Sequence, residues 1–308
     1  MAEPSAADPR PLVTIVTPSY NQGEYITETI ESVLGQDYPR IEYVVMDGGS
    51  TDRTLDILRR YDGRLRWVSQ KDDGQSDAIH RGFSEARGEI IAWLNSDDLY
   101  TPGALSRAVE ALVAAPEAGF VYGRADFIDR EGRPRGSHIY RQWDYDELVD
   151  RRNFIPQPAT FFRRSAYEAI GGLALDLHYV MDYDLWIRLG REFPVTQVPD
   201  VLARIRLFPD TKTASGGLAR IDEIRRMIAR HGRSRLPEWL YWDYVRESIR
   251  ATIALGRLGR RREALWTWTR AMPYMWHPMV VVSAARHVAW RGQLAYRRLA
   301  GARRSPDA

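Results

Sequence analysis

The sequence predicts an α/β fold, a mainly parallel sheet flanked by helices, followed by a C-terminal helical extension. Three observations support this prediction: short apolar runs bounded by turn residues, helical spacing of apolar residues between these runs, and polar segments directly after them. The chain has 308 residues, of which 44% are hydrophobic and 28% charged, and it is long enough to bury a sizeable core.

The expected strands are rich in β-branched residues and span residues 12–17, 41–46, 65–68 and 89–94. Between the first two, apolar residues within 26–34 recur at a spacing that places them on one helix face. Residues 105–113 repeat this spacing, and Thr101 and Pro102 are expected at the N-cap and first turn of that helix. The alternation indicates βαβ units, whose right-handed crossovers cover both faces of a parallel sheet.

We expect three parts in the chain: a disordered lead-in over 1–10, the α/β domain over 11–215 and a helical region over 216–308. Helical patterns in the last part lie near 217–231, 237–257, 260–272 and 278–299. From Arg220 onward the chain has 19 arginines, 7 acids and many tryptophans. Two interpretations remain open: helices that rest peripherally on an anionic membrane surface, or a bundle with tryptophans in its core. No recognised nucleic-acid-binding module accompanies the charge, so we expect no nucleic acid partner.

Composition excludes several classes of protein. There is no cysteine, so a disulfide framework and a thiolate metal site are both impossible. The N-terminal stretch MAEPSAADPRP contains acids and prolines and does not resemble a secretory signal. No window reaches the roughly 18 apolar residues that a membrane-spanning helix needs. We therefore expect a cytoplasmic protein, with the inner face of the membrane as a further location.

Four polar segments follow the expected strands, and they comprise residues 18–21, 47–52, 70–74 and 95–98. They should meet, because ligands of such sheets bind beyond the carboxyl ends of the strands. Together they contain many carboxylates, glycines and small hydroxyls but few cations.

Asp97 and Asp98 are adjacent acids, and such carboxylates are costly to bring together without positive charge nearby. They either shape a turn or hold a hard divalent cation that is shared with phosphate oxygens.

Five stretches occur in this order: VTIVTPSYNQGEYITETIESVLGQDYP, YVVMDGGSTDRT, DDGQSDAIHRGF, GEIIAWLNSDDLYTPGAL and YVMDYDLWIRLG. In order and spacing they resemble the family 2 glycosyltransferases, whose nucleotide-binding domain has the GT-A fold. The resemblance covers residues 12–215. It implies a GT-A type nucleotide-binding sheet and the transfer of a sugar from a nucleotide-diphosphate donor.

The resemblance also implies where the nucleotide lies. Pro18, Tyr20 and Glu24 would border it, with Tyr20 stacking on the base. Asp47 and Asp72 would accept hydrogen bonds from the base or the ribose.

The segment Asn95-Ser96-Asp97-Asp98 corresponds to the family's metal-binding Asp-x-Asp motif. Asn95, Ser96 and Asp97 would contact the nucleotide sugar, and Asp97 or Asp98 would bridge to the diphosphate through Mg²⁺ or Mn²⁺. Such a cation stabilises the negative charge of the leaving group without a proton donor.

The catalytic base implied by the resemblance is Asp182, with Asp184 as the fallback. The family carries a Glu-Asp pair where this chain has Met181-Asp182. The alternative is an ordinary amphipathic helix in which Asp182 interacts favourably with the helix dipole.

Two further positions depart from the family pattern. His80 replaces an Asn found in many relatives, and Phe208 replaces a His, which removes one possible metal or phosphate ligand. Gln157 either contacts a sugar hydroxyl or lies in an extended edge fixed by its neighbouring prolines.

The resemblance thus implies an inverting, metal-dependent hexosyltransferase in polysaccharide or cell-envelope synthesis. UDP-sugar is the first candidate donor, and a glycan or lipid-linked hydroxyl the acceptor. A sugar-phosphate nucleotidyltransferase is an alternative, although TPSYNQGEY has no lysine or arginine to cradle a triphosphate. A catalytically inactive sugar-nucleotide-binding protein is another, because the glutamate before Asp182 is absent.

Overall fold

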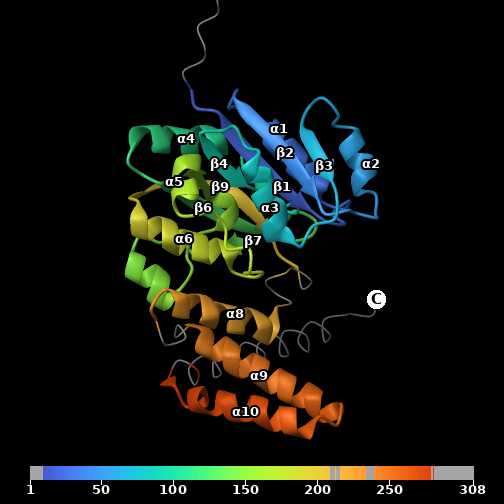
Figure 1. Cartoon of the computed structure of the whole chain (residues 1–308), viewed down its shortest axis with the longest axis vertical. Helices are drawn as coiled ribbons and strands as arrows, with labels where there is room; N and C mark the ends of the chain where they lie inside the picture. Colours follow the sequence, from blue (N-terminus) through green and yellow to red (C-terminus); the bar gives the residue numbers. More distant parts are fainter. Residues whose placement is uncertain (1–9, 209–211, 213–215, 234–238, 279, 281–308) are drawn as a thin grey trace, which may run out of the picture. The chain divides into compact units, whose positions relative to one another are not determined.

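The computed structural model describes residues 10–208, 212, 216–233, 239–278 and 280 (Figure 1). The chain forms two compact units, one of residues 1–148 and 153–215, the other of residues 149–152 and 216–308. In the first unit the helices and strands are β1 (Val13–Ser19), α1 (Ile26–Leu34), β2 (Ile41–Asp47), α2 (Thr54–Arg59), β3 (Arg66–Ser69), α3 (Gln75–Ser84), β4 (Ile90–Trp93), β5 (Leu99–Tyr100), α4 (Ala104–Ala114), β6 (Phe120–Ile128), β7 (Pro134–Ser137), a 3₁₀ turn (Gln157–Ala159), β8 (Thr160–Arg163), α5 (Arg164–Ala169), α6 (Met181–Glu192) and β9 (Val195–Arg206).

The strands form one sheet in the order β3-β2-β1-β4-β8-β6-β9-β5, with β7 paired to β6. The four expected strands make its parallel part: β1 lies between β2 and β4, and β3 flanks β2. The antiparallel strand β8 joins this part to β6, which runs parallel to β9. The predicted α/β fold is therefore confirmed, and alternation along the chain could not reveal the antiparallel strands.

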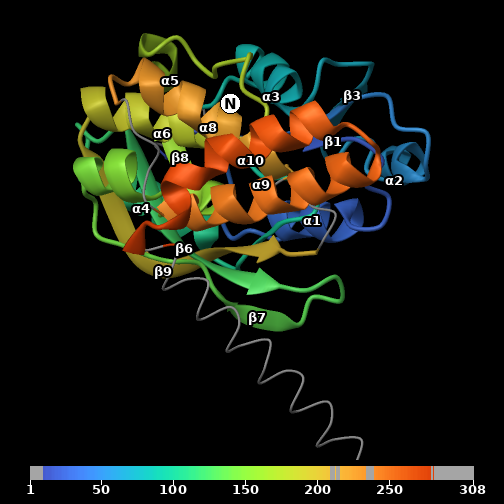
Figure 2. The same cartoon turned by 90° about the horizontal axis from the view of Figure 1, so that it is seen from below.

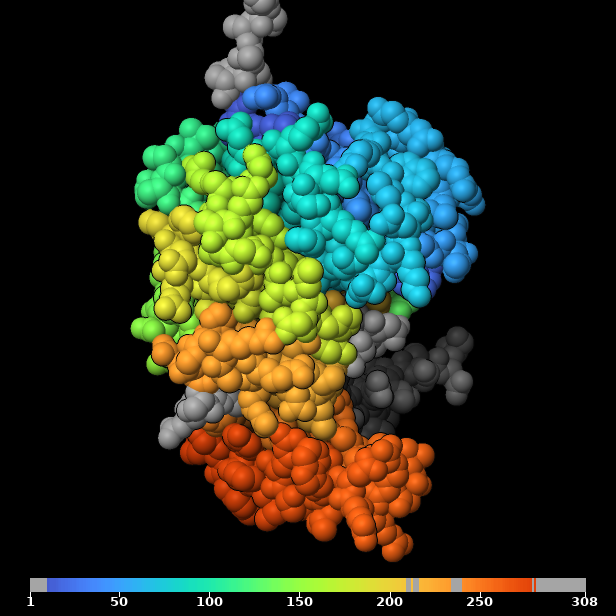
Figure 3. Space-filling model, in the orientation of Figure 1, coloured from blue at the N-terminus to red at the C-terminus, as the bar shows by residue number. Residues whose placement is uncertain are grey.

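Helices cover both faces of the sheet. On one face, α1 and α4 bury Ile26, Ile30 and Leu105 against alternate residues of the strands, such as Ile15. On the other face lie α3, α5 and α6 (Figure 2). In the space-filling view, the α3 region in cyan and the α5–α6 region in yellow-green lie side by side on this face (Figure 3). The result is a three-layer unit whose parallel strands end at a common edge.

The expected start of α4 is wrong. The helix begins at Ala104, after Gly103 in a left-handed conformation with φ 76°. The Thr101 hydroxyl, expected to cap the helix, donates instead to the carbonyl of Val201 at 2.5 Å. The physical reason is the antiparallel pairing of β5 with β9, which continues into Thr101 and uses its backbone N–H as well.

Among its described residues, the second unit contains a π-helical turn (Glu147–Arg151), which begins in the first unit, and three helices. These are α8 (Gly217–Arg230), α9 (Trp239–Arg257) and α10 (Arg261–Met275). They agree with the first three helical patterns expected after residue 215, and the fourth, over 278–299, lies outside the described residues apart from Pro278 and Val280. Helices α9 and α10 pack as an antiparallel hairpin (Figure 1).

Two tryptophans of this region, one within α10 and one just after it, are not core residues. Trp266 is 61% exposed and Trp276, just after the helix, is 84% exposed. Leu265 and Met272 are exposed as well, and their spacing places them on the same face of α10. In the described part of the chain, no helix is both long and apolar enough to cross a membrane.

The contact between α3 and the sheet yields a testable prediction. A Cβ added at Gly82 would lie 2.6 Å from a methyl carbon of Val16 and 3.2 Å from Met46. Gly82→Ala should therefore lower the free energy of unfolding by about 1–3 kcal/mol, although alanine favours helices. The control is Ser84→Ala on the same helix, at an exposed position, which should change stability by no more than about 0.5 kcal/mol. Chemical denaturation of both variants measures the difference, and equal stabilities would contradict the packing described.

Candidate functional site

A cavity of about 1070 Å³ opens at the carboxyl edge of the parallel strands. This volume lies at the upper end of small-molecule sites, which occupy roughly 300–1,000 Å³. All four polar segments expected to meet there contribute to its lining, from the ends of β1, β2, β3 and β4. The predicted site residues that line it are Pro18, Tyr20, Asp72, Asn95, Ser96, Asp97, Asp98 and Asp182.

Three predicted site residues do not line the cavity: Glu24, Asp47 and Asp184. Glu24 is exposed, and its contact with a nucleotide stays a prediction. Asp47 is buried and accepts hydrogen bonds from the backbone of Gly49 and from Ser50 and Ser69, so it organises the loop after β2. Asp184 is buried in an ion pair with Arg188 at 2.7 Å.

The two adjacent aspartates differ in their surroundings. Asp98 is buried, and its carboxylate accepts the backbone N–H of Arg206 at 3.0 Å and the Asn95 amide at 3.1 Å. Burial raises the pKa of Asp98 well above its usual value, and the charge of Asp97 adds to the shift. Both carboxylate oxygens of Asp98 are thus already used inside the protein.

Asp97 is half-buried and lines the cavity. Burial raises the pKa of Asp97, and the charge of Arg206 opposes this shift. Among the described residues, no other side chain donates a hydrogen bond to its carboxylate. Of the two acids, Asp97 is therefore the one with oxygens available to a bound cation.

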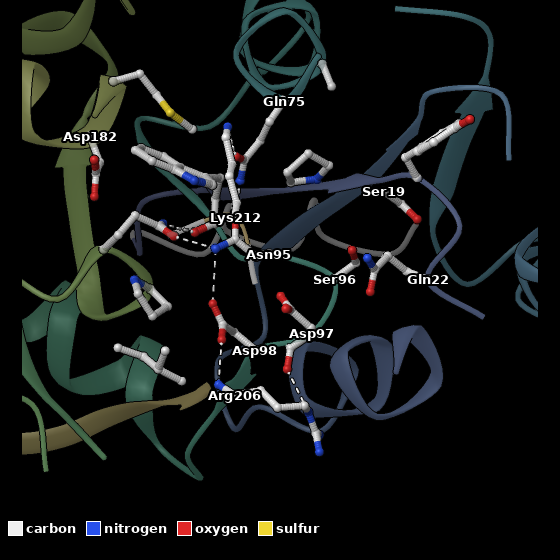
Figure 4. A pocket seen from close by; sticks show the side chains of 18 of the residues that line it. Ser19, Gln22, Gln75, Asn95, Ser96, Asp97, Asp98, Asp182, Arg206 and Lys212 are labelled. Carbon is white, nitrogen blue, oxygen red and sulfur yellow. Dashed lines mark hydrogen bonds between the residues drawn. The ribbon is translucent and has the colours of Figure 1, made fainter. Parts of the chain in front are cut away.

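Asn95 lies at the centre of a network of neutral amides (Figure 4). Its oxygen accepts the Gln75 amide at 2.6 Å, and its nitrogen donates to Asp98 and to Gln157, both at 3.1 Å. Gln157 in turn donates to the Trp93 carbonyl at 2.8 Å. The asparagine supplies a donor to Asp98 where an acid would add a third negative charge.

Asp72 lines the cavity from the loop that follows β3. Its carboxylate accepts the backbone N–H of Gly74 at 2.9 Å and packs against Gly48, where a Cβ would come within 2.7 Å of it. Burial raises the pKa of Asp72, and the charges of Asp77 and Asp47 act in the same direction. Tyr20, 59% exposed, presents its ring at the mouth of the same cavity.

Asp182 reaches the cavity from the first turn of α6. Trp186, four residues later and so on the same side of the helix, stacks between Trp93 and Phe120 with ring centroids 5.7 Å from each. This stacking holds α6 against the sheet and fixes where Asp182 lies. In Figure 4, Asp182 and the side chain of Ser19 lie on opposite sides of Asn95.

Sequence reasoning missed several lining residues, including His178, Arg206 and Gln75. It also gave no role to Lys71 and Lys212, the only lysines of the chain, and both line this cavity. The Lys212 ammonium donates a hydrogen bond to the side-chain oxygen of Gln75 at 2.8 Å. Their rarity in an arginine-rich sequence was the signal that could have found them.

His80 and Phe208, the two further residues that depart from the family pattern, differ in their position relative to the cavity. His80 is exposed on α3 and does not line the cavity. Phe208 does line it, and its ring stacks on Tyr25 with centroids 5.6 Å apart.

The donor set fits a hard divalent cation. Among the described residues there is no cluster of three or more His, Asp or Glu side chains that could enclose a metal ion. Mg²⁺ commonly binds through only one or two carboxylates and completes its coordination with substrate phosphates. Asp97 can offer one carboxylate to a cation, which matches that mode of binding.

Comparison with known sequences gives consistent matches. An uncharacterised glycosyltransferase of Rickettsia typhi is 28% identical over 220 residues, 69% of each chain. One from Mycobacterium tuberculosis is 31% identical over 185 residues, 58% of this chain and 68% of that protein. Chondroitin synthase of Escherichia coli is 30% identical over 191 residues, which cover 61% of this chain but only 28% of that longer protein.

Two solved structures share the fold. The Staphylococcus aureus protein TarS, residues 1–349 in complex with UDP-GlcNAc, matches 84% of this chain and 79% of its own, with a TM-score of 0.61 and 16% identity. Mannosyltransferase PcManGT from Pyrobaculum calidifontis, in complex with GDP-Man and Mn²⁺, matches 94% and 83%, with a TM-score of 0.59 and 21% identity.

The sequence model of the family described as "Glycosyl transferase family 2" matches residues 14–171, which include β1 to β4 and every lining segment that follows them. The cavity, the order of its motifs and this match lead to one conclusion: the chain belongs to glycosyl transferase family 2 and is a glycosyltransferase.

Proposed function

We propose that this glycosyltransferase is metal-dependent and inverting, and that it moves a sugar from a nucleoside diphosphate to an acceptor hydroxyl. The observation that carries the proposal is the placement of Asp97 and Asp182 in one cavity, with Asp97 available to a cation. Two solved structures of the same fold were obtained with UDP-GlcNAc and with GDP-Man and Mn²⁺, which supports a nucleotide-sugar donor.

Asp97 would hold Mg²⁺ or Mn²⁺. Asp98, whose carboxylate oxygens are both used inside the protein, would help to hold Asp97 in position. The bound cation supplies positive charge that stabilises the departing diphosphate. Lys71 and Lys212 line the same cavity and add positive charge that complements phosphate oxygens.

Asp182 would act as the general base. Its carboxylate accepts the proton of the acceptor hydroxyl while the acceptor oxygen forms a bond to the anomeric carbon. The bond between that carbon and the diphosphate oxygen breaks with its electron pair leaving on the diphosphate, so one displacement inverts the anomeric centre. Asp182 lies in the first turn of α6, where a negative charge interacts favourably with the helix dipole.

UDP-sugar is the first candidate donor, with Tyr20 stacking on the base and Asp72 accepting a hydrogen bond from the base or ribose. A glycan or lipid-linked hydroxyl in polysaccharide or cell-envelope synthesis is the proposed acceptor. The family match favours sugar transfer over a nucleotidyltransferase.

The exposed face of α10 suits contact with a membrane surface that presents a lipid-linked acceptor. Leu265, Trp266, Met272 and Trp276 form its apolar part. Arginines gather at its start: Arg257 ends α9, Arg260 lies in the turn between the two helices, and Arg261 and Arg262 begin α10. Aromatic side chains beside arginines are typical of helices that lie on anionic lipid.

The metal assignment predicts the behaviour of Asp97→Asn. Wild-type protein with Mn²⁺ and UDP or GDP should melt at a higher temperature than without metal, because ligands stabilise the folded state by mass action. Asp97→Asn should lose this Mn²⁺-dependent increment and reduce sugar transfer by about 100-fold or more. The control is Asp73→Asn, a carboxylate of the same edge that does not line the cavity. A full Mn²⁺ response in Asp97→Asn would overturn the assignment.

The base assignment predicts a different result for Asp182→Asn. Loss of a general base should lower kcat about 10²–10⁴-fold, while the stabilisation by donor and Mn²⁺ is kept. Asp184→Asn serves as the matched variant on the same helix turn, and it should reduce stability through the lost ion pair with Arg188. A folded Asp184→Asn that loses turnover, beside an active Asp182→Asn, would reverse the two roles.

The surface of α10 predicts lipid selectivity. The full chain should sediment with vesicles of phosphatidylglycerol and phosphatidylcholine at low salt, and less with phosphatidylcholine alone. Replacing Trp266 and Trp276 together by serine should weaken the binding by about tenfold. Val113→Ser, at an exposed apolar position of the first unit, is the control. Equal sedimentation with both kinds of vesicle would contradict the proposed contact.

A further inference from the structure

The side chain of Arg206, the last residue of β9, is buried behind Asp97 and Asp98. It is only 1% exposed, which is rare for a guanidinium and costly unless its donors are satisfied. The mechanism proposed above assigns no role to this residue.

Arg206 fixes the turn that carries both acids. Its backbone N–H donates to the Asp98 carboxylate at 3.0 Å, and its Nε donates to the backbone carbonyl of Asp97, also at 3.0 Å. The carbonyl of Asp98 is held from the other side by the Thr29 hydroxyl at 2.8 Å. The backbone of the turn is therefore anchored on both sides, which limits where the Asp97 carboxylate can point.

The rest of the guanidinium is directed away from the cavity. Its Nη1 donates to the carbonyls of Asp129 and Arg130 at 3.2 and 2.6 Å, and its Nη2 donates to Glu28 at 2.8 Å. These contacts use the fork geometry that distinguishes arginine from lysine. Arg206 thus stays near Asp97 without neutralising its carboxylate by a direct ion pair.

Two stacked aromatic rings flanked by two guanidinium groups hold this arrangement in place. The Arg206 guanidinium lies 4.8 Å from the centre of the Tyr25 ring, and Tyr25 stacks on Phe208. The Arg130 guanidinium lies over the other ring, 4.8 Å from the centre of Phe208. Such contacts favour a guanidinium that is removed from water. They also give Phe208 a packing role at a position where a histidine could have bound metal.

We propose that Arg206 is a positioning residue for the metal site: its fork holds the Asp97 carbonyl and the carbonyls of the turn after β6 together, so that the Asp97 carboxylate is pre-oriented toward the cation. This inference rests on the proposed function, because it takes Asp97 as the metal ligand. Residues that orient a metal ligand typically change metal affinity about 10–100-fold when they are replaced.

The test measures Mn²⁺ binding rather than turnover. Free Mn²⁺ is followed by electron paramagnetic resonance during titration, with whichever of UDP, GDP and dTDP stabilises the wild-type chain most. Arg206→Lys keeps the charge and loses the fork, and Arg206→Gln loses both. Both variants should raise the Mn²⁺ concentration for half-saturation by about tenfold or more. A role confined to folding would instead lower the number of sites per chain and leave the affinity unchanged.

A second pair of variants avoids the buried core. Glu28→Ala removes the outer anchor of Arg206 at a side chain that is 57% exposed, so the fold should survive. It should weaken Mn²⁺ binding in the same direction, by a smaller factor. Glu31→Ala removes the same charge from the same helix at an exposed position beside Arg64 and Tyr61, and it should leave Mn²⁺ affinity unchanged.

The outcomes separate the two proposals. If a folded Arg206→Lys binds Mn²⁺ with wild-type affinity, charge alone is sufficient and the positioning role is overturned. Wild-type affinity in Glu28→Ala also overturns this role, because the outer anchor of Arg206 would then have no effect on the cation. If Asp97→Asn abolishes Mn²⁺ binding in the same assay, the metal assignment stands even when this role fails. If Asp97→Asn binds Mn²⁺ normally, the metal assignment itself is wrong.

Discussion

Two carboxylates that follow one another in a chain repel each other, and their position at the end of β4 needs compensation. The compensation comes from across the sheet. Strand β5, directly after Asp97 and Asp98, pairs antiparallel with β9, with Leu99 opposite Arg204. Two residues beyond this pair, the backbone N–H of Arg206 donates to the Asp98 carboxylate and its Nε donates to the Asp97 carbonyl. A slip of one residue would turn the arginine to the other face of the strand, and the acids would lose their buried positive charge.

The cavity uses neutral groups where charge would be costly. Asn95 and Gln157 satisfy Asp98 and the Trp93 carbonyl without adding charge, and Arg206 directs its donors mainly to backbone carbonyls. Both acids line the cavity, but Asp97 is left with oxygens available, while both carboxylate oxygens of Asp98 accept hydrogen bonds. Asp97 and Asp98 are chemically identical, but burial and hydrogen bonding decide what each carboxylate can bind.

Tryptophan side chains have different surroundings in the two units. In the first, tryptophans such as Trp93 and Trp186 stack in the layer between the sheet and α6, where they fix the helix that carries Asp182. In the second, Trp266 and Trp276 remain exposed beside arginines. Composition alone treats these residues as equivalent, whereas their exposed fractions separate core tryptophans from surface tryptophans.

The sequence by itself determined the α/β fold, the four parallel strands and the edge where their polar segments meet, because these depend on local apolar patterns and on a general rule for parallel sheets. The order of its motifs also predicted Asp97, Asp98 and Asp182 as site residues, and all three line the cavity. Only the tertiary structure decided that Asp98 is used internally, that Asp47 and Asp184 lie outside the cavity, and that Arg206, more than 100 residues away, supports the turn. The reason is physical: these outcomes depend on contacts between β5 and β9 and between α6 and the sheet, and no local pattern in the chain encodes a contact between distant segments.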